Sequence, residues 1–113
     1  MAQPDIVTQD QSSQIVMIPG LYRRTMATGE RMMVVEIYVE RGTLIPMHQH
    51  MHEQVGYVSI GKVEFTIAGE KHLLQVGDTY AIPGGVEHEA FAHDDTVLIE
   101  VFSPPREEFR TQK

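Results

Sequence analysis

The sequence contains no cysteine, so it can form neither a disulfide nor a metal site with thiolate ligands. Positive charge is scarce, because nine lysine and arginine residues stand against sixteen acidic residues and give a formal net charge of −7. A negative surface repels polyanions, so we expect neither a nucleic-acid partner nor attachment to an anionic membrane. No apolar run approaches the ~18 residues of a membrane-spanning helix, and residues 1–13 lack the basic and apolar regions of an export signal. We therefore expect a cytoplasmic protein.

The length of 113 residues, 42% of them hydrophobic, is enough for one domain with a packed core. Residues 1–13 are rich in glutamine, aspartate and serine and predict a flexible N-terminal arm, which leaves residues 14–113 as the single domain. Short apolar segments alternate with turn residues at spacings of about 8–12 residues, a pattern typical of an all-β sandwich or barrel. The pairs Gly29-Glu30 and Gly69-Glu70 predict hairpin turns with glycine first. No segment shows a sustained helical period, so we expect little helix.

Side chains able to bind a metal fall at alternate positions of one segment: His48, His50, His52 and Gln54. On a single extended strand they would all point the same way. Imidazole is the commonest metal ligand among side chains, and a His-x-His pair brings two of them onto one ion. His88, which follows a Pro-Gly-Gly turn, is the best candidate for a ligand from a neighbouring strand. A compact site cannot hold every side chain of the segment, so His52 is expected either to support the ligands from behind or to line the mouth of a cavity. The alternative for the whole group is a surface cluster of histidines.

The last apolar segment carries a carboxylate in its middle. By alternation Glu100 and Phe102 share one face, while Val101 takes the other. If the first face looks into a barrel, burial raises the pKa of Glu100 and makes it a candidate for proton transfer. The alternative is an edge strand that holds Glu100 in solvent.

A cation near the same end of the chain could hold an anionic substrate. Arg106 follows a rigid Ser-Pro-Pro turn, which favours a position at the rim of the barrel. Its alternative role is a surface ion pair with Glu107 or Glu108. Arg23 or Arg24 from an early strand would offer the same chemistry.

Two motifs point to one family. The first is formed, at matching spacings, by Gly42, His48, His50, Gln54 and Gly61, and the second by Gly77, Pro83, Gly85 and His88. The sequence therefore resembles the cupin family, with glutamine at the usual glutamate position of the first motif. This resemblance implies an all-β fold, a single RmlC-like antiparallel jelly-roll barrel of six or more strands with a metal inside.

The same resemblance implies one divalent transition metal, with ligands His48, His50, Gln54 and His88. No soft ligand is available, so Mn, Fe, Ni and Zn all remain possible. With Gln54 all four donors are neutral, and the ion keeps its full charge. We therefore expect a stronger Lewis acid, bound less tightly, than a site with glutamate at this position would give.

A narrower resemblance rests on the run from Glu100 to Arg106, together with the histidine segment before it. It is similar to small single-domain cupins of the pectin-degradation protein KdgF type, whose corresponding run typically begins with aspartate. This implies metal-assisted conversion of unsaturated uronates from pectin to the linear keto sugar acid. Glu100 would then fall on a residue of acid–base chemistry, and Phe102 and Arg106 on the substrate side.

Glu100 is one methylene longer than the family aspartate, so other functions stay open. A cupin dioxygenase is a second enzymatic reading, and a module that binds a metal or a small molecule without catalysis is a third. One fold hosts many activities, so the site must decide among them. We also expect a homodimer, because jelly-roll cupins commonly pair through their strands and most soluble oligomers are symmetric.

Overall fold

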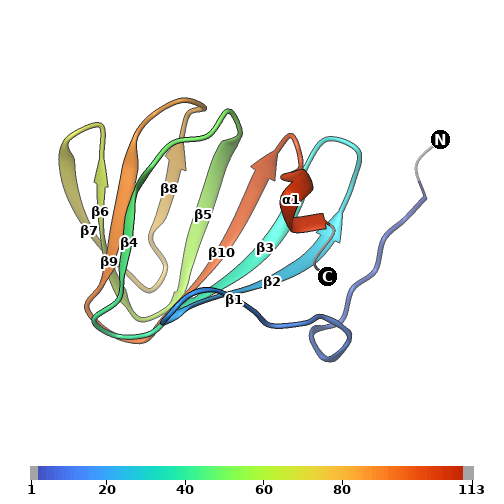
Figure 1. Cartoon of the computed structure of the whole chain (residues 1–113), viewed down its shortest axis with the longest axis horizontal. Helices are drawn as coiled ribbons and strands as arrows, with labels where there is room; N and C mark the ends of the chain where they lie inside the picture. The colour runs from blue at the N-terminus through green and yellow to red at the C-terminus, as the bar shows by residue number, and fades with distance from the viewer. Residues whose placement is uncertain (1–2, 111–113) are drawn as a thin grey trace.

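The computed structural model describes residues 3–110 and consists of two antiparallel sheets that face each other (Figure 1). One sheet has six strands in the order β1-β2-β3-β10-β5-β8, and the other has four in the order β4-β9-β6-β7. The strands are β1 (Ile15–Ile18), β2 (Leu21–Thr28), β3 (Met33–Val39), β4 (Leu44–His48), β5 (Glu53–Ile60), β6 (Lys62–Ile67), β7 (Glu70–Gln75), β8 (Thr79–Ile82), β9 (His88–Ala92) and β10 (Thr96–Ser103). The expected all-β jelly-roll barrel is confirmed.

Helix is confined, within the described residues, to the 3₁₀ turn η1 (Gln9–Gln11) and to α1 (Glu107–Arg110). The expectation of little helix is therefore met, and no helix of the described chain is long and apolar enough to cross a membrane. Residues 1–2 of the expected arm and residues 111–113 of the expected domain lie outside the described residues.

The core follows from alternation along the strands. In β3 and β10 every second side chain is buried, and its neighbours are only half-buried. Val39, Val58, Val63 and Ala92 have no exposed surface at all and pack between the sheets. The apolar face of each strand is thus hidden against the opposite sheet, which is what stabilises a two-layer β structure.

Two predicted turns differ in the structure. Between β2 and β3, Thr28 pairs with Met33, so the connection has four residues, and the Gly29 N–H donates to the Met32 carbonyl oxygen at 2.8 Å. The backbone of Gly29 does not have a positive φ. Between β6 and β7, the two turn residues are Ala68 and Gly69, with φ of 50° and 83°. Both predictions of a glycine-first turn were wrong, and the second turn instead has the paired positive φ that suits the twist of a hairpin.

The segment before β1 lies on β2 and β3. The Asp5 carboxylate accepts the backbone N–H of Thr28 at 2.9 Å, and the Gln9 amide donates to Glu36 at 3.2 Å. Arg24 donates to the Ser12 carbonyl oxygen at 3.0 Å. Arg24 therefore holds the N-terminal segment and does not reach the barrel interior, which removes it as a candidate for substrate binding.

Candidate metal centre

The predicted ligands gather at one end of the barrel, where β4 ends and β5 and β9 begin (Figure 1). The expected single strand through residues 48–54 is wrong, because β4 stops at His48 and a loop over residues 49–52 precedes β5. The loop packs on the Pro-Gly-Gly turn: the Gly85 N–H donates to the His50 carbonyl oxygen at 2.8 Å, and a Cβ on Gly84 would overlap the Met51 carbonyl. This turn draws the chain away from extended geometry.

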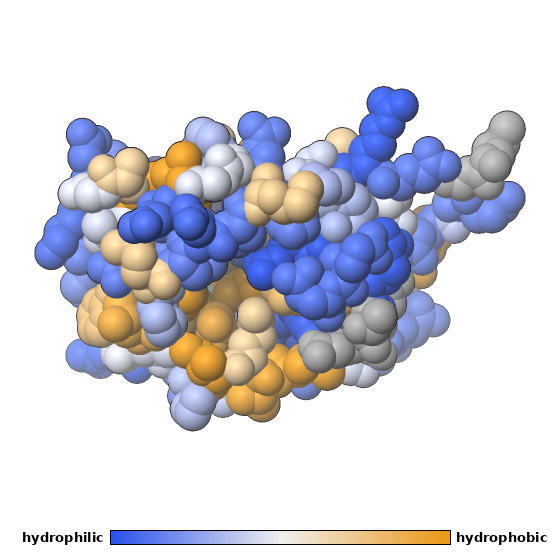
Figure 2. Space-filling view, turned by 45° about the horizontal axis from the view of Figure 1, so that its top comes forward, coloured by the Kyte–Doolittle hydropathy of each residue, from blue (hydrophilic) through white to orange (hydrophobic). Residues whose placement is uncertain are grey.

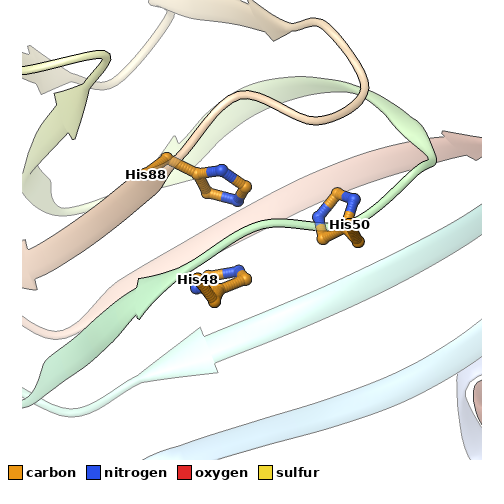
Figure 3. A group of neighbouring side chains, drawn as sticks. All are labelled: His48, His50 and His88. Atoms are coloured by element: carbon orange, nitrogen blue, oxygen red, sulfur yellow. The ribbon is translucent and has the colours of Figure 1, made fainter.

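Three histidines nevertheless converge. The ligand atoms of His48, His50 and His88 all lie within 4.8 Å of one another, and Figure 3 shows the three rings turned toward a common space. The His48 and His88 ring centroids are 4.2 Å apart, and those of His50 and His88 are 5.2 Å apart. A metal–nitrogen bond is about 2.1 Å long, so two nitrogens that bind one ion lie at most about 4.2 Å apart. A small inward movement of the three rings would bring their nitrogens within this distance.

Each of these histidines has one ring nitrogen fixed by the backbone. Nδ1 of His48, His50 and His88 lies 2.8, 3.0 and 2.9 Å from the carbonyl oxygens of Pro46, His52 and Val86. A carbonyl oxygen only accepts, so the proton belongs on Nδ1 and the lone pair on Nε2. Nε2 of His88 is buried and has no hydrogen-bond partner among the described residues. A buried acceptor of this kind fits a ligand atom of a metal site.

Gln54 brings a further lone pair to the same place. Its side chain is 5% exposed, and its amide nitrogen donates to Glu100 Oε2 at 2.6 Å, which leaves Oε1 turned toward His50 Nε2 at 3.1 Å. Burial, and then the charge of Arg106, lower the pKa of His50 to about 4, so its ring is neutral at neutral pH and carries one proton. With that proton on Nδ1, Nε2 and Gln54 Oε1 are two acceptors that a shared cation would satisfy. The residues present therefore fit a divalent transition metal.

The carboxylate of Glu100 is inside the barrel. Its residue is 5% exposed, so the expected inward face is confirmed and the edge-strand alternative is wrong. Burial raises the pKa of Glu100, and hydrogen bonds from Tyr80 and Gln54 oppose that shift. The Tyr80 hydroxyl donates to Oε2 at 2.6 Å, the same oxygen that Gln54 contacts.

Tyr80 was not predicted as a site residue. It lies on β8, its residue is 8% exposed, and burial beside Glu100 raises the pKa of Tyr80 well above its ordinary value. The phenol therefore stays protonated and donates. Alternation along β8 carried a signal for its inward face, because exposed and buried residues alternate through Thr79–Ile82. The pairing of β8 with β5, which brings Tyr80 near Glu100, had no counterpart in the sequence motifs.

Arg106 lies at the rim over aromatic rings. Its guanidinium carbon is 4.1 Å from the centroid of Phe109 and 5.1 Å from that of Phe102, and its side chain is 16% exposed. It also donates to Glu108 at 3.1 Å, so the expected rim position and the alternative ion pair occur together. Arg23 is 1% exposed and lies 4.4 Å from the same Phe109 ring. Two guanidinium groups thus contact the ring of Phe109, a favourable cation–π arrangement.

A cavity borders one of the three histidines and the residues beside them. Its volume is about 60 Å³, several times the ~10–15 Å³ that one water needs. Its polar lining residues are His48, Gln54, Glu100 and Arg106, and Phe102 is among its apolar ones. Figure 2, which brings the upper end of Figure 1 forward, shows a hollow with apolar walls near the middle of this face and hydrophilic side chains along its upper border.

His52, expected at the mouth of this cavity, does not line it. It is half-buried in the loop after β4, with its ring centroid 5.5 Å from that of His50. The loop breaks the alternation on which the expectation rested, so His52 no longer follows the direction of its neighbours. Its carbonyl oxygen lies 3.0 Å from Nδ1 of His50, so His52 supports a proposed ligand from behind instead of lining the cavity.

Comparisons with known proteins agree with this geometry. The Cupin domain family matches residues 35–102. The chain is 33% identical over 92 residues to the pectin degradation protein KdgF of Dickeya dadantii (strain 3937), across 80% of this chain and 84% of that protein. The structure of KdgF from Halomonas sp. superposes with a TM-score of 0.86 at 32% identity, covering 91% of this chain and 96% of that one. An RmlC-like cupin from Shewanella frigidimarina NCIMB 400 gives 0.89 at 30% identity, with 96% and 97% covered.

Proposed function

This chain belongs to the cupin family, and from that premise we propose that it is a metal-dependent enzyme that converts an unsaturated uronate from pectin, or a related sugar acid, to its linear keto form. The similarity to KdgF proteins from two organisms supports a role in pectin breakdown. The observation that carries the proposal is a buried carboxylate, Glu100, joined by one hydrogen bond to Gln54 beside three converging histidines.

The metal would be held by His48, His50, Gln54 and His88. A divalent Mn, Fe, Ni or Zn ion bound there supplies Lewis acidity to a substrate oxygen. The neutral donor set keeps the ion's charge, which favours an anionic or carbonyl ligand.

The remaining residues of the cavity would bind and orient the substrate. Arg106 carries a charge at the rim and pairs with the substrate carboxylate, a bond that guanidinium makes in two parallel N–H contacts. Phe102, which is 2% exposed and lines the cavity, packs against the apolar face of the sugar and excludes water.

Glu100 would move the protons. The reaction is an isomerisation: the anomeric hydroxyl loses its proton and becomes the carbonyl of carbon 1 as the bond from carbon 1 to the ring oxygen breaks. The ring oxygen becomes the carbonyl of carbon 5, and the electron pair of the double bond between carbons 4 and 5 takes a proton at carbon 4. No atom is gained or lost, so one carboxyl group that takes the first proton and returns one to carbon 4 suffices. The extra methylene of Glu100, compared with aspartate, is accommodated by contacts to Gln54 and Tyr80 that hold its head group in one place.

We further propose that the enzyme is a cytoplasmic homodimer. Across four neighbouring strands, the outward row Ala81, Val55, Val101 and Val34 is entirely apolar. Val55 is 46% exposed. Because each copy carries a net charge of −7, two copies approach best through an uncharged patch. Light scattering on the purified chain is expected to give twice the monomer mass, and Val55→Lys is expected to give the monomer.

The enzymatic proposal is tested by purifying the chain without a histidine tag, measuring its metal content, and following loss of the ultraviolet absorbance of an unsaturated uronate. We expect a rate above spontaneous ring opening that disappears with a chelator. Oxygen consumption would instead support a dioxygenase. A wild type that binds metal but never exceeds the spontaneous rate on any unsaturated uronate would support a binding module and reject the proposal.

A further inference from the structure

One row of inward side chains across the large sheet has a gap in it. In the register of the strands, Tyr80 of β8 lies opposite Gly56 of β5, and Gly56 lies opposite Glu100 of β10. Tyr80 and Glu100 are therefore two strands apart, farther than directly paired side chains. They meet because Gly56 has no side chain between them.

The gap is filled by the phenol ring itself. A Cβ built on Gly56 would overlap the Cζ and hydroxyl oxygen of Tyr80. The backbone of Gly56 is not left-handed, so the glycine is not required by its φ angle. Space for Tyr80 is the structural reason for glycine here. The ring is also fixed on its other side, where its centroid lies 4.4 Å from that of Phe65.

The consequence is an asymmetry between the two oxygens of Glu100. Tyr80 and Gln54 both donate to Oε2, each at 2.6 Å. Within the described residues no hydrogen bond ends on Oε1, and Glu100 borders the cavity. Charge-assisted hydrogen bonds of this length are strong and directional, so two of them fix both the position and the rotation of the carboxylate.

We propose that Tyr80, reaching across Gly56, is a positioning residue that pins Oε2 of Glu100 and thereby presents Oε1 to the substrate as the atom that exchanges protons. This inference rests on the proposed function of Glu100. Tyr80 does not line the cavity, and its hydroxyl contacts the site through the carboxylate of Glu100. A longer side chain has more freedom than the aspartate of related enzymes, and the second donor removes that freedom.

The test is Tyr80→Phe, which keeps the ring and its contact with Phe65 and removes only the hydroxyl. We expect kcat to fall by about ten- to a hundredfold, with KM and metal content unchanged. The matched control is Tyr22→Phe, which removes a hydroxyl that donates to Glu40 at 2.8 Å on the surface, and it is expected to keep wild-type kcat.

A double variant separates positioning from general loss of structure. If Tyr80 acts through Glu100, adding Tyr80→Phe to Glu100→Gln lowers kcat no further, because the group it positions is already gone. A further tenfold loss in the double variant overturns the inference, and so does a loss of metal in Tyr80→Phe. Wild-type kcat in Tyr80→Phe overturns it while leaving the proposed function standing. Absence of turnover in the wild type overturns the proposed function first, and the inference with it.

Discussion

The two ends of the barrel interior are built by the same alternation of strands and filled with different chemistry. At one end Val39, Val58 and Val63 have no exposed surface and belong to the hydrophobic core. At the other, Gln54, His88 and Glu100 are nearly as buried. Burying apolar surface stabilises the fold, whereas a buried polar group without a partner destabilises it. The difference shows that an inward position fixes the degree of burial and leaves the chemistry to the residue and its partners.

The polar end compensates for its burial through a chain of donors and acceptors. Tyr80 and Gln54 donate to Glu100, and the histidines near Gln54 donate to backbone carbonyls. The groups left over, above all Nε2 of His88, are those to which the proposed metal would bind.

The largest effect is expected when the histidines are removed. His48→Ala/His50→Ala deletes two of the proposed ligands, so metal content should fall to background and turnover to the spontaneous rate. Elemental analysis and the ultraviolet assay measure both. His72→Ala/His93→Ala is the matched control, because these half-exposed histidines lie outside the cluster, and it should keep full metal and activity. Equal metal in wild type and in the first variant would contradict the proposed centre.

Glu100→Gln comes next. The amide can still accept from Gln54 and Tyr80, so the fold and the metal should be retained while the proton-transfer group is lost. General acid–base catalysis is worth at least about a hundredfold, and kcat should fall by that factor or more. Glu70→Gln, a change at an exposed carboxylate, should leave kcat as it is. Activity close to wild type in Glu100→Gln would exclude Glu100 from the chemistry.

Gln54→Glu should have a smaller and mixed effect. An added negative charge beside His50 strengthens attraction for a divalent ion, so competition with a chelator should show tighter binding. The same change removes the amide donor from Glu100 and sets two carboxylates side by side, so kcat should fall by about tenfold. Gln75→Glu on the surface is the control for the added charge. Unchanged metal affinity in Gln54→Glu would mean that Gln54 is not a ligand.

The smallest effect on catalysis is expected at the apolar end. Val63→Ala removes buried methyl groups and leaves a cavity, so the free energy of unfolding should fall by about 2 kcal/mol, or roughly 8 °C in Tm. Metal content and kcat at room temperature should not change. Chemical denaturation beside the activity assay measures the two quantities separately. A large loss of kcat in the folded Val63→Ala variant would mean that the two ends are coupled.

Much of the architecture could be predicted because it follows from patterns of residues that are close together in the sequence. Alternation in the last strand put Glu100 and Phe102 on the inward face, and the structure agrees. The two motifs identified the histidines that converge. The prediction of one strand through residues 48–54 was wrong because no glycine or proline marks the turn after His48. The loop is held instead by Gly84 and Gly85, which lie far along the sequence.

The features that could not be predicted from the sequence also depend on contacts between residues far apart in the chain. The contact of Tyr80 with Glu100 depends on which strands are neighbours in the sheet. A local sequence pattern does not predict the order of the strands. Arg24 could not be told from Arg23 until the pairing of β2 fixed which one faces inward: Arg23 is 1% exposed, whereas Arg24 holds the N-terminal segment. Interior position along a strand is a property of period two, and contact between strands is a property of the whole fold.

The backbone carbonyls that hold the three histidines bear on how such a protein changes over evolutionary time. A side-chain partner can be lost by a single substitution, but every amino acid carries a carbonyl oxygen, so substitutions at Pro46, His52 or Val86 leave the acceptor in place as long as the chain keeps its path. The orientation of the imidazoles is therefore inherited with the fold. Arg106 borders the same cavity through its side chain alone, so a substitution there would alter the cavity while leaving the histidine cluster in place.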